Sequence, residues 1–200
     1  MQMKKNKCEQ RLVEMRALDN EDDKMIIEGY AIVYDQPATH TYGSRSFTEV
    51  ICRGALDNTD MKDVPLRYNH NDTWCIMART RNNSLQLIKD EKGLKIRAEL
   101  IDTQSNRDIY RSIKEGLIDG MSFSFTVADQ GDEWSYGESE TTRKVTSINK
   151  LYDVSVVDIP FYDTTNVFAR SFELLDSNLE QLESFDLRKR KLILLNKYTA

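Results

Sequence analysis

Residues 120–125 read Gly-Met-Ser-Phe-Ser-Phe, and this stretch decides the fold. Apolar side chains at positions 121, 123 and 125 alternate with the hydroxyl side chains of Ser122, Ser124 and Thr126. Strict alternation predicts a β-strand with one apolar face and one hydroxyl face. The apolar face belongs in a core. The hydroxyl face either meets water or carries a reactive serine, because buried hydroxyls without partners are costly.

Length, charge and cysteine content restrict the classes of function. The 200 residues, 40% hydrophobic and 30% charged, suffice for one globular domain with a core. A net charge of -5 is not the basic footprint of a nucleic-acid-binding protein. Cys8, Cys52 and Cys75 form no C-x-x-C pair, so we expect no disulfide framework and no zinc site. The chain has no P-loop, G-x-G-x-x-G or H-E-x-x-H motif, so we expect no cofactor and no metal. We also expect a location in the bacterial cytoplasm or another cytosol, and no membrane partner, since no apolar run is long enough for a span or a signal peptide.

Short alternating segments surround the serine strand. We expect further strands at residues 9–18, 25–34, 47–51, 64–70, 76–80, 84–89, 94–100, 143–148 and 151–159. A single mid-chain helix begins near Ser105 and ends at Gly116, and polar composition predicts loops at residues 36–46 and 129–142. This order of elements predicts a β-rich α+β fold, a mostly closed antiparallel β-barrel ringed by a few helices.

The hydrophobic pattern changes after residue 170. Phe172, Leu175, Leu179, Leu182 and Phe185 recur at intervals of three and four residues, which predicts an amphipathic helix. A basic run at residues 188–191 follows it. We therefore divide the chain into a β-barrel domain at residues 1–170 and a tail at residues 171–200. The basic run is typical of a solvated helix end, and the alternative is that the tail docks on a partner helix.

A nucleophilic serine needs a base, and the chain contains two histidines. His40 falls in an expected loop, and we interpret it as a structural or surface residue. His70 ends an expected strand and is either a satisfied structural residue or the base for Ser122. A third group would orient the imidazole. Asp153, placed by alternation on the face of Leu151, is one candidate, and Asp158 on the opposite face is its competitor.

Five segments, in order and with compatible spacing, resemble the prohead maturation proteases of tailed bacteriophages. They are residues 28–35, 47–56, 64–71, 116–125 and 151–157. The resemblance implies a serine peptidase with a barrel similar to that of the herpesvirus assembly proteases.

The resemblance also implies a role for particular residues. His70 would be the general base and Ser122 the nucleophile, with Asp153 as the third member where the family commonly has Glu. Backbone N–H groups near Phe161 and Tyr162 would form the oxyanion hole.

The resemblance further implies an endopeptidase inside the assembling prohead, in the cytoplasm of the host bacterium. Its substrates would be the scaffolding protein or a scaffold-like segment of the major capsid protein, and the protease itself, with residues 171–200 as the docking or self-cleavage region. A homo-oligomer, such as a dimer, is expected. Two alternatives stay open: a catalytically inactive scaffold or capsid-docking protein of the same fold, and a small barrel that binds oligonucleotides, against which the acidic charge counts.

Overall fold

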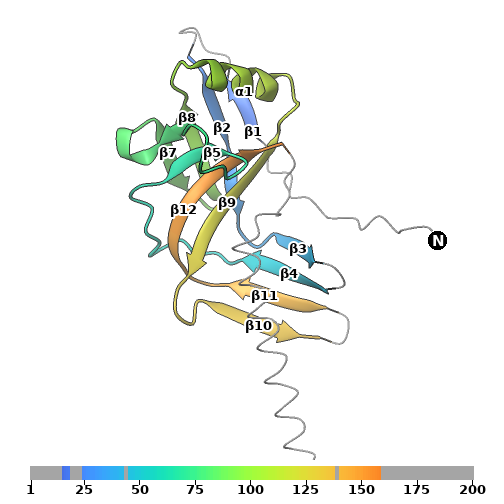
Figure 1. Cartoon of the computed structure of the whole chain (residues 1–200). Coiled ribbons are helices and arrows are strands. Elements are labelled where there is room, and N and C mark those ends of the chain that lie inside the picture. The colour runs from blue at the N-terminus through green and yellow to red at the C-terminus, as the bar shows by residue number, and fades with distance from the viewer. Residues whose placement is uncertain (1–14, 19–23, 43–44, 138–139, 159–200) are drawn as a thin grey trace, which may run out of the picture. The chain divides into compact units, whose positions relative to one another are not determined.

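The computed structural model describes residues 15–18, 24–42, 45–137 and 140–158 (Figure 1). The expected tail at residues 171–200 lies outside the described residues. Its helix and the division of the chain at residue 170 therefore stay predictions.

The described residues form short strands and a single α-helix. The elements in chain order are β1 (Met15–Leu18), β2 (Ile26–Val33), β3 (Pro37–Tyr42), β4 (Arg45–Ile51), β5 (Pro65–Tyr68), β6 (Ala78–Arg79), β7 (Leu85–Lys89), β8 (Gly93–Glu99), α1 (Gln104–Lys114), β9 (Gly120–Val127), β10 (Asp132–Tyr136), β11 (Thr141–Val145) and β12 (Ile148–Val157). A 3₁₀ turn, Thr80–Asn82, follows β6. The β-rich class with a mid-chain helix is thus confirmed.

The strands pair in three four-stranded sheets, in the orders β1-β2-β8-β7, β10-β11-β4-β3 and β6-β5-β12-β9. Most pairs are antiparallel, but β11 with β4 and β12 with β5 are parallel. The expected mostly closed barrel is not confirmed, because no sheet in the described part of the chain closes on itself. β2 contacts β9, but its ladders are with β1 and β8, and β9 belongs to the third sheet.

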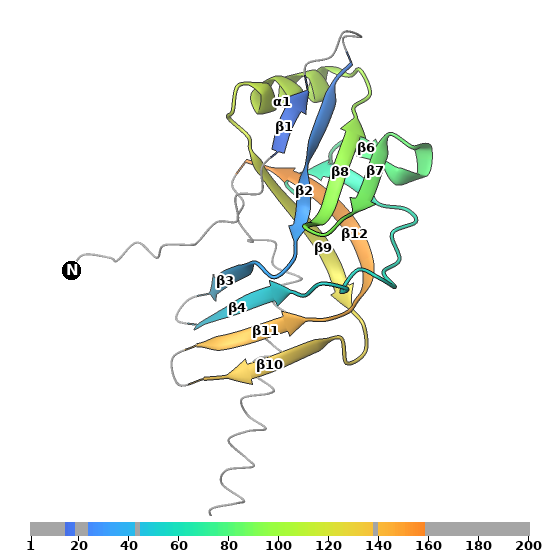
Figure 2. The same ribbon diagram turned by 180° about the vertical axis from the view of Figure 1, so that it is seen from behind.

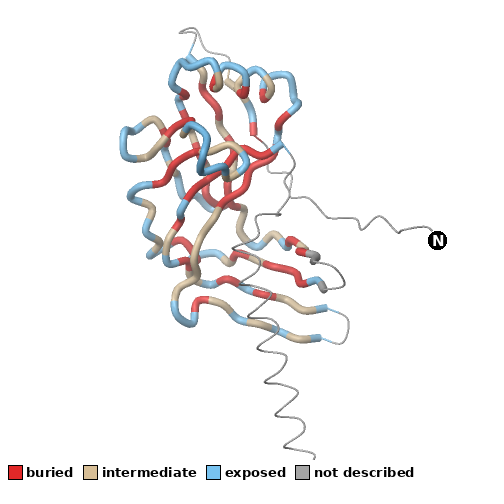
Figure 3. Tube along the Cα trace, viewed as in Figure 1, coloured by how far each residue is buried: buried red, intermediate tan, exposed pale blue. Residues whose placement is uncertain are grey.

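The core lies between the first and third sheets, and α1 lies across one end of β1 and β2 (Figures 1 and 2). Buried stretches follow the strands of these sheets, whereas the loops and the outer side of α1 are exposed (Figure 3). Helix α1 contributes Ile109 and Ile113 to the core. It ends at Lys114, two residues before the expected Gly116, whose φ of 70° suits a residue without a Cβ. The apolar residues of β9, Met121 and Phe123, are also core residues.

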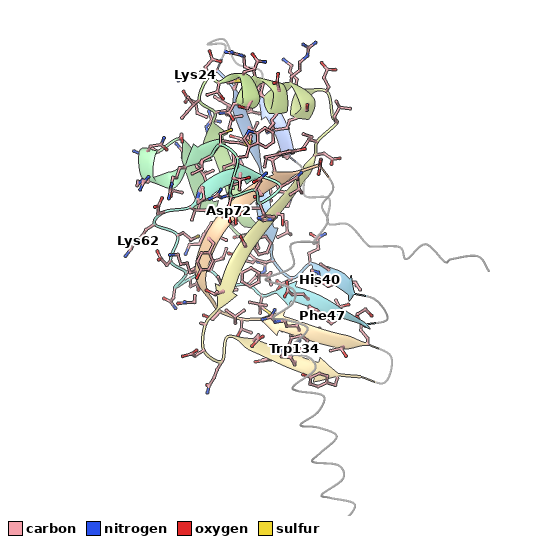
Figure 4. All side chains as sticks on the ribbon, in the orientation of Figure 1. Lys24, His40, Phe47, Lys62, Asp72 and Trp134 are labelled. Carbon is pink, nitrogen blue, oxygen red and sulfur yellow. The ribbon has the colours of Figure 1, made fainter. Side chains whose placement is uncertain are left out.

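The second sheet contains the segments expected as loops. Residues 36–46 hold β3 and the start of β4, and residues 129–142 hold β10 and the start of β11. The loop prediction is wrong because aromatic side chains alternate within these polar segments and share one face of the sheet. Trp134 of β10 packs on Phe47 of β4, and His40 of β3 packs on the other side of Phe47, with ring centroids 5.3 Å and 5.1 Å apart (Figure 4).

Candidate active site

The third sheet places three strands of the site side by side. Ser122 lies on β9, Asp153 on the neighbouring β12, and His70 follows β5, which pairs with the other edge of β12. Across β9 and β12, Ser122 lies opposite Ser155, and Ser124 lies opposite Asp153. Cross-strand partners share a face of the sheet, so the hydroxyl face of β9 and the carboxylate of β12 lie together.

A β-bulge in β12 brings Asp153 to this face. Leu151 lies opposite Phe125, whereas Asp153, two residues later, lies opposite Ser124, so Tyr152 is an additional residue in the ladder. Tyr152 is 49% exposed and Leu151 is fully buried. The prediction that Leu151 and Asp153 share a face is wrong, because alternation does not hold across the bulge.

His70 reaches the same face from a tight turn. Strand β5 ends at Tyr68, and both Asn69 and His70 have a φ of 51°, in the left-handed region that L-residues adopt at a cost. The turn is held by the N–H of Asn69, which donates to the carbonyl of Val156 at 2.9 Å, and by the N–H of Asn71, which donates to the carbonyl of Tyr68 at 3.1 Å. The expectation that His70 lies on a strand face is therefore wrong.

Three side chains from these elements form a continuous chain of hydrogen bonds. Nε2 of His70 lies 2.8 Å from Oγ of Ser122, and Nδ1 of His70 lies 2.6 Å from Oδ1 of Asp153. The side chains of His70 and Asp153 are only 13% and 12% exposed, and Ser122 is buried. A hydroxyl bonded to an imidazole whose second nitrogen meets a carboxylate is the arrangement of an activated serine nucleophile.

The family comparison agrees with this arrangement. The family model described as caudovirus prohead serine protease matches residues 11–178, most of the chain. The chain belongs to this family. The family is one of serine peptidases that act in capsid maturation. Its members work in the assembling capsid inside the host cell, and the family implies contact with capsid or scaffold proteins. Comparisons with curated proteins and with solved structures find no match.

In this candidate site of the prohead protease, Asp153 accepts three hydrogen bonds. In addition to His70, the hydroxyl of Ser155 donates to Oδ1 at 2.9 Å, and the hydroxyl of Ser124 donates to Oδ2. Burial alone raises the pKa of Asp153, but the hydrogen bond and charge of His70, with the two hydroxyls, outweigh burial and lower the pKa below its ordinary value. The carboxyl group is therefore ionised at neutral pH.

The competing carboxylate has other contacts. Asp158 is exposed, and its Oδ2 accepts a hydrogen bond from the hydroxyl of Tyr68 at 2.9 Å. Its N–H donates to Oδ1 of Asn69 at 3.3 Å. The structure thus brings Asp153, not Asp158, to the imidazole of His70.

Of the remaining candidate residues, His40 is among those that the structure describes. His40 is buried on β3, with Nε2 at 3.6 Å from Oε1 of Glu49, and the structure does not bring it to Ser122. Phe161 and Tyr162, expected near the oxyanion hole, lie outside the described residues. In the part of the chain that the structure describes, no group of three or more His, Cys, Asp or Glu could hold a metal ion. No helix among these same residues is long and apolar enough to cross a bilayer.

Sequence reasoning missed the residues that support the three central side chains. Ser155 and Ser124 both bond Asp153, and Arg67 of β5 bonds the loop that carries His70. The alternation of β12 places Ser155 on the face of Asp153, and this signal could have identified it. Arg67 has no such signal, because its partners are the carbonyl of Asn71 and the carboxylate of Asp72.

Proposed function

We propose that this chain is a serine endopeptidase that cleaves the scaffolding protein, or a scaffold-like segment of the major capsid protein, during head assembly. The observation that carries the proposal is the hydrogen-bonded series from Ser122 through His70 to Asp153, with distances of 2.8 Å and 2.6 Å. These distances are short enough for proton transfer to begin without rearrangement of the side chains.

In this mechanism His70 acts first as a base and then as an acid. Nε2 takes the proton of Ser122 as Oγ bonds to the carbonyl carbon of the scissile peptide. The protonated imidazole then gives that proton to the leaving amine as the C–N bond breaks, which leaves an acyl-enzyme. A water molecule, deprotonated by the same Nε2, then attacks the ester carbonyl. Nε2 returns this proton to Oγ of Ser122 as the C–Oγ bond breaks, which releases the second product and restores the enzyme.

Asp153 has two tasks in this scheme. It holds Nδ1 as the protonated nitrogen, and its negative charge stabilises the imidazolium that forms at each step. The lowered pKa of Asp153 keeps that charge in place at neutral pH. Backbone N–H groups near Phe161 and Tyr162 are our proposal for the oxyanion hole, which stabilises the tetrahedral intermediate.

We further propose that the chain cleaves itself, that residues 171–200 are the docking or self-cleavage region, and that it works as a homo-oligomer. A catalytically inactive docking protein is not favoured, because the family is one of serine peptidases.

The decisive experiment incubates the purified chain with the major capsid and scaffolding proteins of the same phage. Intact-mass spectrometry is expected to show defined fragments with the wild type and none with Ser122→Ala. A fluorophosphonate is expected to add one mass increment to the wild type, at Ser122, and none to the variant. Equal cleavage by the wild type and Ser122→Ala would refute the assignment of Ser122.

A further inference from the structure

Ser155 is a fully buried polar residue at the centre of the site. It lies on β12 between Arg67 of β5 and Ser122 of β9 in the cross-strand register. Its exposed fraction is 0%, and its hydroxyl makes three contacts. Oγ accepts the backbone N–H of His70 at 3.2 Å, lies 3.2 Å from Nδ1 of His70, and donates to Oδ1 of Asp153 at 2.9 Å.

The hydroxyl of Ser155 supports the bond that sets the protonation of the imidazole. An ionised carboxylate only accepts, so the Ser155 hydrogen is directed at Oδ1 of Asp153 and restrains that oxygen. Nδ1 of His70 lies 2.6 Å from the same oxygen and must itself carry a proton to donate to it. Nε2 is left as a bare acceptor, which is the form of His70 that can take the proton of Ser122.

The same hydroxyl also supports the backbone of the turn. The N–H of His70 belongs to a residue with φ 51°, outside any strand ladder, and Ser155 Oγ is its acceptor. Without that acceptor, a partly buried N–H would lose its hydrogen bond, and the left-handed turn would lose a restraint.

We propose that Ser155 is a positioning residue of the active site: its hydroxyl ties the His70 turn to Asp153 and holds Oδ1 of Asp153 where it keeps the imidazole protonated at Nδ1. This inference deepens the proposed function and rests on His70 acting as the base. Ser155 acts through His70 and Asp153 and does not itself touch the substrate.

The test compares Ser155→Ala with a matched control. Ser84→Ala removes a serine with the same bonding pattern, since Ser84 Oγ accepts the N–H of Arg79 at 2.8 Å and donates to Asn82 at 2.6 Å, but it lies at the 3₁₀ turn outside the site. We expect Ser155→Ala to lower kcat about 100-fold with little change in KM, because a misplaced base slows only the chemical step. Ser84→Ala is expected to keep the kcat of the wild type.

A second readout reports the tautomer directly. The chain has two histidines, so ¹⁵N chemical shifts of the imidazole nitrogens can be assigned with a single His40→Gln variant. We expect the neutral imidazole of His70 to be protonated at Nδ1 in the wild type, and a mixture of tautomers in Ser155→Ala. A merely structural role for Ser155 would leave the tautomer unchanged.

The outcomes separate this inference from the proposed function. Two results would overturn the inference: a wild-type His70 protonated at Nε2, or a folded Ser155→Ala with the kcat and tautomer of the wild type. In either case, cleavage and fluorophosphonate labelling would still support the peptidase. If Ser155→Ala does not fold, Ser155→Cys keeps the volume with a weaker donor, and the same loss of kcat is expected. A wild type that neither cleaves the substrates nor reacts with the fluorophosphonate would refute the peptidase. The tautomer of His70 in the wild type would still test the hydrogen-bond pattern among Ser155, His70 and Asp153.

Discussion

Replacement of Asp153 by Asn is the most informative single change. The variant keeps the volume of the side chain and removes its charge. Two donors meet at Oδ1, from His70 and Ser155, and Ser124 donates to Oδ2. An amide has one oxygen and one NH₂ group, so it cannot accept at both positions.

Both orientations of the amide lower the rate. With NH₂ facing His70, Nδ1 must accept, the ring protonates at Nε2, and it can no longer take the proton of Ser122. With oxygen facing His70, the tautomer survives, but the imidazolium loses its counter-charge. The same replacement in a well-studied Ser-His-Asp triad lowers kcat about 10⁴-fold, equivalent to about 5.5 kcal/mol of transition-state stabilisation, and we expect a loss of that order.

The assay is cleavage of purified scaffolding protein under single-turnover conditions. Asp158→Asn is the control, since it removes the competing carboxylate, which accepts a hydrogen bond from the hydroxyl of Tyr68. It is expected to cleave at nearly the wild-type rate. A rate for Asp153→Asn close to that of Asp158→Asn would refute the role of Asp153, and a large loss in Asp158→Asn alone would reverse the assignment.

Three further outcomes are expected. The pKa of Asp153 is lower in the folded than in the unfolded chain. Its stabilising contribution is therefore present above about pH 4 and is lost as the pH falls through the pKa of the folded chain. In urea unfolding, the free energy of unfolding should fall more on acidification for the wild type than for Asp153→Asn. In Gly93→Ala the new Cβ would lie 1.9 Å from the carbonyl oxygen of Ile32, which should lower the free energy of unfolding by about 3 kcal/mol. In Gly116→Ala the new Cβ meets nothing within 4 Å. Only the left-handed φ then opposes the substitution, and the same assay should show a loss of about 1–2 kcal/mol. Arg67→Gln frees the loop after His70 and should lower kcat about tenfold with little change in the unfolding midpoint, while an unchanged kcat would show that the turn holds without it.

The local pattern of the sequence predicted the rigid parts of the site. Alternation over residues 120–126 predicted a strand with Ser122 and Ser124 on one face, and β9 covers Gly120–Val127. The apolar face of that strand packs in the core as expected, with Met121 and Phe123 buried. The two faces of a strand are set by residues that are close in sequence, so the alternation of apolar and polar residues is enough to predict them.

The position of His70 could not be predicted from periodicity. Alternation continues through residues 64–70, so the imidazole was expected on a strand face. The backbone instead enters the left-handed region at Asn69, where an Asn tolerates positive φ through its short side chain. The acceptors that hold this turn, the carbonyl of Val156 and the hydroxyl of Ser155, are far away in sequence.

The second sheet and the open arrangement of strands were also beyond a local analysis. Residues 129–142 are polar, and composition favoured a loop, but pairing of β10 with β11 and of β11 with the distant β4 satisfies their backbone groups. The division of the strands into three sheets depends on which strands pair, such as β2 with β1 and β8, and the pattern within one segment does not report that choice.

The turn at Asn69 and His70 makes the base the most easily lost member of the site. Ser122 and Asp153 are held in ladders between strands, whereas the imidazole depends on two strained residues and a few bonds across them. Opening of this short segment would break both imidazole contacts together and leave a latent enzyme with an intact core. We therefore expect hydrolysis to fade at urea concentrations below those at which the sheets melt, so the peptidase can be silenced without being unfolded.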